Sequence, residues 1–229
     1  MALTLQACRS GRNSLGKYCS FVNFTILLKK ENSMPENYPT SPIELFSEWF
    51  LEAQKLGLRE PTAATVSTCS KDGMPSCRVL LLKKFDETGF RFYCNLTSRK
   101  GKEINDNPNA ALCFFWDTML RQVRIEGHVE PVSQKEADDY FAKRDRGSQI
   151  GAWASKQSHV MENPEDLPNR IKEITTQFKG QVIPRPPFWS GFCVVPKTIE
   201  FWQSGEFRLN TRILYTKSHG SWKIERLYP

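Results

Sequence analysis

Three short stretches that have the apolar pattern of strands also carry cations: residues 78–83 (RVLLLK), 98–100 (SRK) and 121–124 (RQVR). A cation on a half-buried sheet is costly unless an anion meets it. Together the three stretches predict a site for a ligand that carries phosphate.

Arg99 and Lys100 open a predicted short helix, where free backbone N–H groups and the helix dipole favour an anion. The alternative is that both are solvated surface charges, and on these two residues alone it is the stronger interpretation. Arg78 and Lys83 are five residues apart, so an alternating strand would direct them to opposite faces and toward different groups.

Tyr140, Arg144 and Ser148 are spaced at i, i+4 and i+8 on a predicted helix and its continuation. If the helical path continues, they offer a phenol, a guanidinium and a hydroxyl on one side, which suits a phosphate. The spacing supports equally well a core Tyr140 and an Arg144 that interacts with the helix C-terminus.

Two further sets could contact a planar ring. Trp202, followed by Arg208 and Arg212, offers an aromatic face and two cations, or else belongs to a strand with ordinary cross-strand packing. Side-chain amides and a hydroxyl could hydrogen-bond a heterocycle, although most glutamines at such positions do not: Gln122, Gln157 and Ser158.

The elements that must position these residues follow from caps and periodicity. Ser41 to Glu44 is a capping box with Pro42 at the first helical position, and an apolar stripe follows as far as Gly57. Strands are predicted at 64–69, 76–83 and 90–94, which together form a meander. A short helix at 98–105 follows, and further strands are predicted at 110–116 and 122–129.

A second capping box, Ser133 to Glu136, opens another helix. A third helix is predicted at 163–180, with Leu167, Ile171, Ile174 and Phe178 inward, and a Pro-rich connection follows at 181–189. Strands are predicted at 192–195, 198–203, 208–215 and 222–227. The fold class is therefore α+β, mainly β with peripheral helices, in a closed or split β-barrel.

The composition fits one core in a chain of 229 residues with 39% apolar residues. The net charge of +7 is concentrated in residues 1–30, which hold five basic residues and no acid, so the remainder is nearly neutral and a nucleic-acid partner is not expected.

Residues 1–30 have the composition of a mitochondrial transit peptide, and a disordered, unprocessed tail is equally well supported. No stretch is long enough to span a bilayer.

Seven cysteines without a C-x-x-C motif, and only three histidines, favour neither a disulfide framework nor a metal site. They indicate a reducing compartment. We expect a cytoplasmic protein, with mitochondria as the alternative. The glycine-rich loops that bind nucleotides are absent from the sequence.

From about Ser41 to Pro229 the chain resembles the pyridoxine (pyridoxamine) 5′-phosphate oxidases, FMN enzymes of vitamin B6 metabolism. The segments that carry the resemblance are RVLLLK at 78–83, NLTSRK at 95–100, RQV at 121–123, SQIGAWASKQS at 148–158, IEFWQ at 199–203 and WKIERL at 222–227. The resemblance implies an extension at 1–40 and an FMN-binding split-barrel domain at 41–229.

In that family FMN lies between the two subunits of a homodimer. The matching residues here are Arg78, Val79, Leu80, Leu81, Leu82, Lys83, Tyr93, Cys94, Arg99, Lys100, Gln122, Gln157, Ser158, Trp202 and Arg212. The residues that match the family's substrate-phosphate site are Lys83, Tyr140, Arg144 and Ser148. Arg208 matches an arginine over the substrate ring, and Asn210 occupies the position of a substrate-facing histidine, so these two are the predicted catalytic residues.

Three departures from the family pattern matter. The usual Arg-Leu-His-Asp-Arg is here Arg208-Leu-Asn-Thr-Arg212, and the Asn210 amide cannot titrate near neutral pH. The common Tyr-Thr pair is Tyr93-Cys94. The family's N-terminal segment that closes over substrate has no counterpart before Ser41.

The resemblance implies removal of hydride from the C4′ carbon of pyridoxine or pyridoxamine 5′-phosphate to the flavin N5, with O2 as final acceptor. The products are pyridoxal 5′-phosphate and H2O2. One alternative is a paralogue that binds FMN or pyridoxal phosphate without turnover, and another is a split-barrel flavoprotein that reduces a different substrate.

Overall fold

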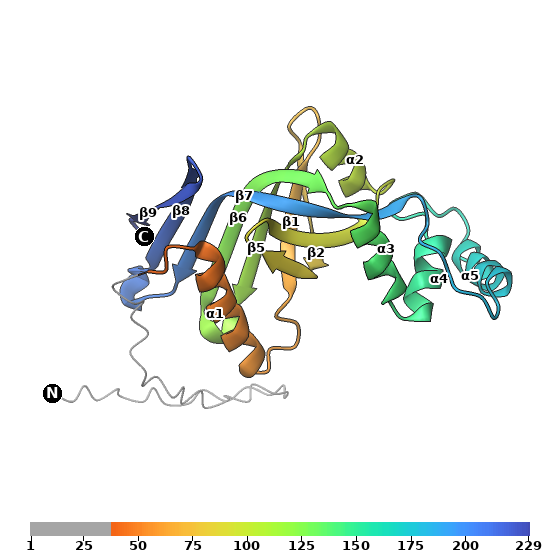
Figure 1. The fold of residues 1–229 in the computed structure, drawn as a ribbon, viewed down its shortest axis with the longest axis horizontal. Helices are drawn as coiled ribbons and strands as arrows, with labels where there is room; N and C mark the ends of the chain where they lie inside the picture. Colours follow the sequence, from red (N-terminus) through yellow and green to blue (C-terminus); the bar gives the residue numbers. More distant parts are fainter. Residues whose placement is uncertain (1–37) are drawn as a thin grey trace, which may run out of the picture. The chain divides into compact units, whose positions relative to one another are not determined.

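The computed structural model describes residues 38–229. Within them, nine strands form one antiparallel sheet that curls on itself, in the order β2-β1-β5-β6-β7-β4-β3, with β8 and β9 continuing from β7 (Figure 1). The strands are β1 (Ala63–Cys69), β2 (Pro75–Leu81), β3 (Lys84–Asp86), β4 (Gly89–Asn95), β5 (Asn109–Trp116), β6 (Arg121–Pro131), β7 (Trp189–Gln203), β8 (Thr211–Ser218) and β9 (Ser221–Leu227).

The sheet divides at β7, a strand of 15 residues. One edge of β7 pairs with β6, while the other pairs with β4 over its first half and with β8 over its second half. A bulge at Glu126 and Gly127 of β6 accompanies this division, and a Cβ on Gly127 would lie 2.0 Å from the Val195 carbonyl oxygen. Only glycine allows the two strands to approach so closely. This geometry confirms the predicted split barrel.

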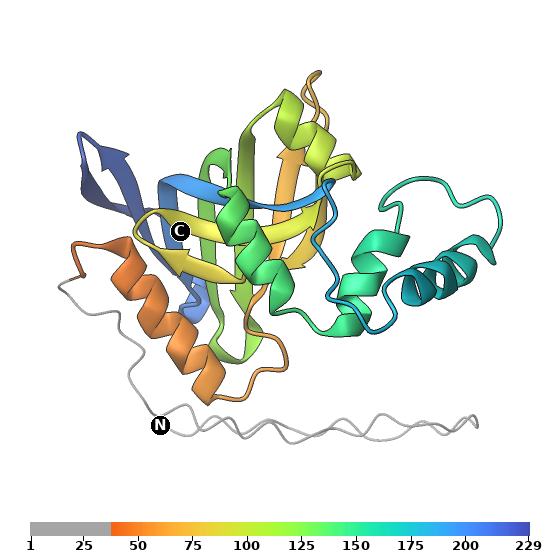
Figure 2. The ribbon, with the colours of Figure 1, turned by 45° about the vertical axis from the view of Figure 1, so that its right-hand side comes forward.

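Helix α1 (Pro42–Lys55) covers the apolar inner face of the sheet (Figure 2). Ser41 caps it by accepting the Ile43 N–H at 3.2 Å, as the sequence predicts. Phe46 is fully buried and packs edge-on against Phe90 at 5.0 Å between ring centroids. Trp49 makes a similar contact with Phe201 of β7 at 5.2 Å. Burial of these aromatic rings is therefore the main link between α1 and the barrel.

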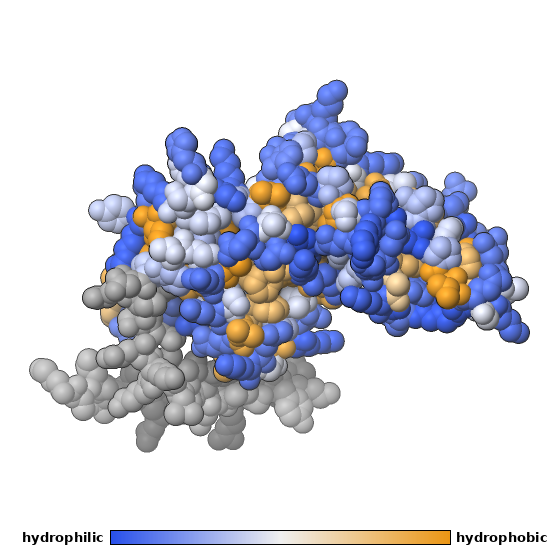
Figure 3. Space-filling view, viewed as in Figure 1, coloured by the Kyte–Doolittle hydropathy of each residue, from blue (hydrophilic) through white to orange (hydrophobic). Residues whose placement is uncertain are grey.

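The remaining helices are α2 (Arg99–Asp106), α3 (Gln134–Ala142), α4 (Arg146–Ala154) and α5 (Asp166–Gln177). Two short 3-10 turns, η1 (Asp117–Met119) and η2 (Glu206–Arg208), interrupt the loops. Helices α4 and α5 form a second apolar cluster with the start of β7. On the face shown in Figure 3, hydrophobic side chains gather over the end of the molecule that these two helices form.

The predicted meander was wrong. Strand β2 pairs with β1, but β4 pairs with β3 and β7 instead of β2. The chain changes its pairing partner at two successive backbone amides. The Leu82 N–H donates to the Thr62 carbonyl oxygen at 2.8 Å, and the Lys83 N–H donates to the Arg91 carbonyl oxygen at 2.9 Å. The chain thus leaves one ladder for another within one residue, and the short strand β3, which the sequence did not predict, follows.

Several predicted boundaries also differ. The stretches 192–195 and 198–203 belong to one strand, β7, and the strand predicted from 208 begins at Thr211. The third helix is shorter than predicted. Ile171 is 39% exposed because Ile174 and Phe178, and not Ile171, pack into the second apolar cluster. No helix within residues 38–229 is long and apolar enough to cross a membrane.

Candidate functional site

A cavity of about 490 Å³ lies between β2, α3, α4 and the start of β7. It is lined by all four residues predicted to bind the substrate phosphate: Lys83, Tyr140, Arg144 and Ser148. The rest of the wall is formed by Leu80, Leu81, Tyr93, Lys143, Asp145 and Trp189. The sequence prediction that these four side chains lie together is therefore confirmed.

The helical path from Tyr140 to Ser148, on which the spacing argument depended, does not continue. Helix α3 ends at Ala142, and Asp145 caps a separate helix, α4, by accepting the Ser148 N–H at 2.8 Å. Arg144 therefore lies in the link between the two helices. Because the link turns the chain, Tyr140 and Ser148 still border the same cavity from different helices.

Three aromatic rings stand nearly parallel at this cavity. Tyr93 and Tyr140 stack at 3.9 Å between centroids, and Tyr93 and Trp189 at 5.5 Å. The Tyr93 hydroxyl donates to Glu136 of α3 at 3.3 Å. Burial, together with the nearby Glu136 carboxylate, raises the pKa of Tyr93, and burial raises that of Tyr140. Both phenols therefore remain protonated hydrogen-bond donors at neutral pH.

A second group of predicted site residues surrounds the start of α2. Arg78 of β2 donates to Thr68 Oγ1 at 2.5 Å and forms an ion pair with Glu103 at 3.4 Å. The exposed Arg99 pairs with the same carboxylate at 2.8 Å. Burial alone would raise the pKa of Glu103, but hydrogen bonds from Ser76, Thr68 and Arg99 outweigh it and hold the pKa at about 2. One carboxylate therefore forms ion pairs with two of the cations here and offsets one of their two positive charges.

Lys100 differs from its neighbours. Its side chain is buried, with the residue only 6% exposed, and the ammonium donates to Ser98 Oγ at 3.2 Å and to Gln157 Oε1 at 3.0 Å. Both partners are neutral, and burial lowers its pKa. A buried ammonium bonded only to neutral groups fits the phosphate of a cofactor such as FMN. The buried thiol of Cys94 lies in the same region, and burial raises its pKa to about 11.

A third group lies on the sheet. Gln122, Trp202 and Arg212 are directly opposite one another across β6, β7 and β8. They alternate with the buried Val123, Phe201 and Ile213, so they point outward. The Arg212 guanidinium is held by Glu200 at 2.8 Å.

Arg78 belongs to the other face of the sheet. It lies opposite Val66, which is 1% exposed and points into the core. The structure therefore distributes the residues predicted to bind FMN over both faces of one sheet. Within one chain it brings Arg78, Lys100 and Gln157 near one another, and separately Gln122, Trp202 and Arg212.

Arg208 and Asn210 lie between β7 and β8, in the loop that contains η2. Arg208 is exposed and has a φ of +65°, and the preceding Phe207, 90% exposed, has a φ of +55°. The Asn210 side-chain oxygen accepts the Gly205 N–H at 3.2 Å. Asn210 thus closes a loop whose backbone is strained at two successive residues.

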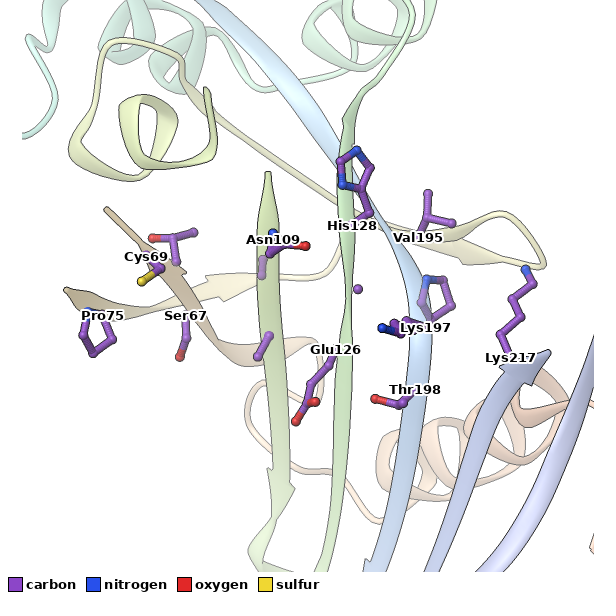
Figure 4. A pocket seen from close by; sticks show the side chains of 15 residues that line it. Ser67, Cys69, Pro75, Asn109, Glu126, His128, Val195, Lys197, Thr198 and Lys217 are labelled. Atoms are coloured by element: carbon purple, nitrogen blue, oxygen red, sulfur yellow. The ribbon is translucent and has the colours of Figure 1, made fainter. Parts of the chain in front are cut away.

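A larger cavity, of about 760 Å³, lies on the outer face over β1, β5, β6 and β7 (Figure 4). Glu126, His128, Lys197 and Lys217 are among the side chains that line it. None of the residues predicted from the sequence borders this cavity. Volume alone does not identify the functional site.

Comparisons with known proteins agree with the sequence resemblance. A family model described as pyridoxamine 5′-phosphate oxidase matches residues 50–177. The chain belongs to this family. A second model, described as the pyridoxine 5′-phosphate oxidase C-terminal dimerisation region, matches residues 189–229.

Curated relatives of this family include pyridoxine/pyridoxamine 5′-phosphate oxidases from several bacteria. The protein from Rubrobacter xylanophilus is 50% identical over 82% of this chain and 87% of its own length. That from Myxococcus xanthus is 50% identical over 83% and 93%. Relatives this similar along nearly their whole length support the family assignment over the entire described domain.

Solved structures show the same fold. PhzG from Burkholderia lata, in complex with tetrahydrophenazine-1-carboxylic acid, has a TM-score of 0.82 and 30% identity over 87% of this chain and 98% of its own. An FMN-binding protein from Nostoc punctiforme, related to pyridoxamine 5′-phosphate oxidase, has a TM-score of 0.68 at 15% identity over 82% and 98%. The second likeness concerns the fold alone.

Sequence reasoning missed three residues that contact the predicted site. Glu103 lies four residues after Arg99 on α2, a spacing that could have revealed it. Glu200 stands two residues before Trp202 on the same strand, and its role needs the register with β8. Trp189 was placed at the end of a Pro-rich connection, and no local pattern indicates that it borders the cavity.

Proposed function

We propose that this protein is an FMN-dependent oxidase that converts pyridoxine 5′-phosphate and pyridoxamine 5′-phosphate to pyridoxal 5′-phosphate, with O2 as acceptor and H2O2 as product. The observation that carries the proposal is the convergence of Lys83, Tyr140, Arg144 and Ser148 on one cavity. It is supported by curated relatives that are about 50% identical and named for this activity. The same relatives do not favour a binding paralogue without turnover.

In this proposal the chain supplies binding and orientation. Lys83 and Arg144 attract the substrate phosphate, and the hydroxyl groups of Tyr140 and Ser148 donate hydrogen bonds to it. Arg208 lies over the substrate ring. Bound FMN supplies the two-electron acceptor chemistry, which no side chain of this chain could provide. No acid–base pair is therefore required of the protein, which suits a site with Asn210 in place of a histidine.

For FMN, the proposed phosphate ligands are Arg78, Arg99, Lys100, Gln157 and Ser158. The ring and ribityl contacts are proposed for residues 79–83, Tyr93, Cys94, Gln122, Trp202 and Arg212. Lys100 carries most of this assignment, because its buried ammonium has only neutral partners in the described chain.

We further propose that the site is shared between two subunits. Arg78 and Gln122 point to opposite faces of one sheet, so one chain cannot easily direct both toward the same ligand. Trp202, Arg208 and Arg212 all lie in the segment that matches a dimerisation region. A two-fold dimer would present these residues to the α2 end of the partner.

The purified protein tests the function directly. It should be yellow, release FMN rather than FAD on denaturation, and take up O2 with either phosphorylated vitamer. Recovery of FAD, a protein that stays colourless after addition of FMN, or a flavin-loaded protein that consumes no O2 would contradict the proposal.

A heterodimer tests the shared site. Lys100→Ala and Arg212→Ala subunits carrying different affinity tags are co-expressed, and the mixed dimer is purified. If each site takes Lys100 from one subunit and Arg212 from the other, one of its two sites is intact and about half of the wild-type activity remains. If each subunit forms its own site, the heterodimer is as inactive as the parent variants.

Residues 1–37 lie outside the described part of the chain, so the interpretations of the first 30 residues as a transit peptide or as a tail stay predictions. The boundary between an extension at 1–40 and a functional domain at 41–229 is likewise part of our proposal. We propose a cytoplasmic location, and the activity proposed above does not depend on it.

A further inference from the structure

We propose that Trp189 is a positioning residue that holds Arg144 in place for the substrate phosphate, in the role that a carboxylate has beside most buried arginines. This inference rests on the proposed function, because it concerns the phosphate of a B6 vitamer. It adds a residue that the sequence did not predict.

The contact is direct. The guanidinium carbon of Arg144 lies 4.8 Å from the centroid of the Trp189 ring, and 5.9 Å from that of Phe141. The Arg144 side chain also donates to the Ser148 carbonyl oxygen at 3.2 Å. Burial lowers the pKa of Arg144. An aromatic face is attractive to a cation in such a partly desolvated place.

Several other arginines, two of them predicted to bind FMN, are instead paired with carboxylates. Arg78 lies 3.4 Å from Glu103, Arg91 3.0 Å from Asp86, and Arg212 2.8 Å from Glu200. Within residues 38–229, Arg144 forms no ion pair within 4.0 Å. The neighbouring Asp145 carboxylate lines the same cavity and, against the larger effect of burial, raises the pKa of Arg144, but it caps α4 by accepting the Ser148 N–H instead of pairing with the guanidinium. A carboxylate would compete with phosphate for the N–H groups of the guanidinium. The indole face stabilises the cation and leaves most of those donors free.

Trp189 is itself firmly held. It is 4% exposed, its ring is within 2° of parallel to that of Tyr140, and it packs edge-on against Phe141 at 5.1 Å. Its carbonyl oxygen accepts from Arg185 at 2.6 Å. Arg144, in contrast, lies in the link between α3 and α4, where no helix restricts its side chain. The fixed ring therefore restricts the rotamers of a cation that would otherwise be mobile.

The test compares Trp189→Phe and Trp189→Leu in the FMN-loaded protein, with O2 uptake as the assay. A benzene ring attracts a cation less than an indole, and an aliphatic group does not attract it. The KM for pyridoxine 5′-phosphate should rise about threefold in the Phe variant and about tenfold in the Leu variant, while kcat stays within about twofold. In an Arg144→Ala background, Trp189→Leu should produce no further rise in KM.

Phe178→Leu is the matched control. Phe178 is 8% exposed in the same apolar cluster and contacts Trp153 at 5.5 Å, away from Arg144. It should lower the melting temperature comparably to Trp189→Leu without changing KM. An equal rise in KM in this control, an unchanged KM in Trp189→Phe, or full additivity with Arg144→Ala would overturn the proposal. The Phe variant keeps the test valid even if the Leu variant does not fold.

A binding measurement separates this inference from the proposed function. Pyridoxal 5′-phosphate is titrated into each FMN-loaded protein and competed with inorganic phosphate. If the wild type consumes no O2 yet Trp189→Leu weakens binding of pyridoxal 5′-phosphate about tenfold, the function fails and the role of Trp189 holds. If the wild type turns over and the variants match it in KM and binding, the function holds and the role of Trp189 fails.

Discussion

The cations of two regions of this protein have different kinds of partner. At the start of α2, Glu103 forms ion pairs with both Arg78 and Arg99, at 3.4 and 2.8 Å. Beside α3 and α4, Lys83 and Arg144 face one cavity, and Arg144 rests on an aromatic ring instead of a carboxylate. The first region thus has a resident carboxylate paired with two of its cations, whereas within residues 38–229 neither Lys83 nor Arg144 forms an ion pair.

In the proposed function, the difference corresponds to two kinds of ligand. A cofactor that stays bound can share its cations with a resident carboxylate, because the network also stabilises the folded protein around it. A substrate that must bind and leave at each turnover is better served by cations without an internal competitor, since its phosphate then supplies the missing anion. Lys100 is the exception in the first region, and it is the cation that we expect FMN to depend on most.

The largest effect is expected for Arg144→Ala. Loss of a guanidinium that has no ion-pair partner should lower kcat/KM for pyridoxine 5′-phosphate about 100-fold, equivalent to about 3 kcal/mol, the upper range for a hydrogen bond between charged groups. The change should appear in KM, with FMN content unaltered. Lys135→Ala removes an exposed lysine of α3 and should have no effect. A loss of FMN in Arg144→Ala would show that the two regions are not separate.

Lys100→Ala should weaken FMN binding about 10- to 100-fold, because the variant lacks the cation that has no internal anionic partner. Flavin fluorescence on titration of the apoprotein measures this directly. Lys102→Ala, an exposed lysine on the same helix, is the matched control. Equal losses in the two variants would indicate a general electrostatic attraction rather than a specific contact.

Glu103→Gln removes the resident negative charge, and it should strengthen FMN binding about threefold to tenfold while preserving the shape of the network. The ion pairs of Glu103 also make the stability of the folded protein depend on pH. The pKa of Glu103 is about 2 in the folded protein and 4.5 without its partners. The stabilisation by the Glu103 carboxylate is therefore fully present above pH 4.5 and is lost as the pH falls toward 2. Melting temperatures of the apoproteins should therefore converge in that window. A constant difference between wild type and variant would contradict the assigned pKa.

The sequence predicted that Tyr140, Arg144 and Ser148 lie together only if one helical path continued, and they border one cavity although that path does not continue. Periodicity placed Tyr140, Arg144 and Ser148 on one side, whereas the Asp145 cap that separates two helices was a visible local signal that was not used. Tyr140 and Ser148 remain close to each other because the link between α3 and α4 is short.

Strand pairing was harder to predict, for a physical reason. Phe90 pairs with Val194, more than a hundred residues away, while the apolar pattern of each strand specifies only its own two faces. The faces of Arg78 and Gln122, and hence the case for a shared site, depend on these distant registers. The local sequence around Trp189 does not predict its contact with Arg144 either, because that contact depends on where β7 begins.

The smallest effect is expected at Asn210, where the chain departs from its family. Its side-chain oxygen accepts the Gly205 N–H at 3.2 Å and closes the loop that presents Arg208. In Asn210→His, a ring nitrogen can accept the same hydrogen bond, and the new group can also contact substrate, so turnover on pyridoxine 5′-phosphate should rise, by about tenfold at most. The variant should also acquire a pH dependence near the histidine pKa of about 6.5, which the wild type lacks at this position. Asn210→Leu, which removes the acceptor, should instead lower turnover because Arg208 is no longer held. Equal activity in wild type, His and Leu variants across pH 5.5 to 8 would show that residue 210 takes no part in presenting Arg208.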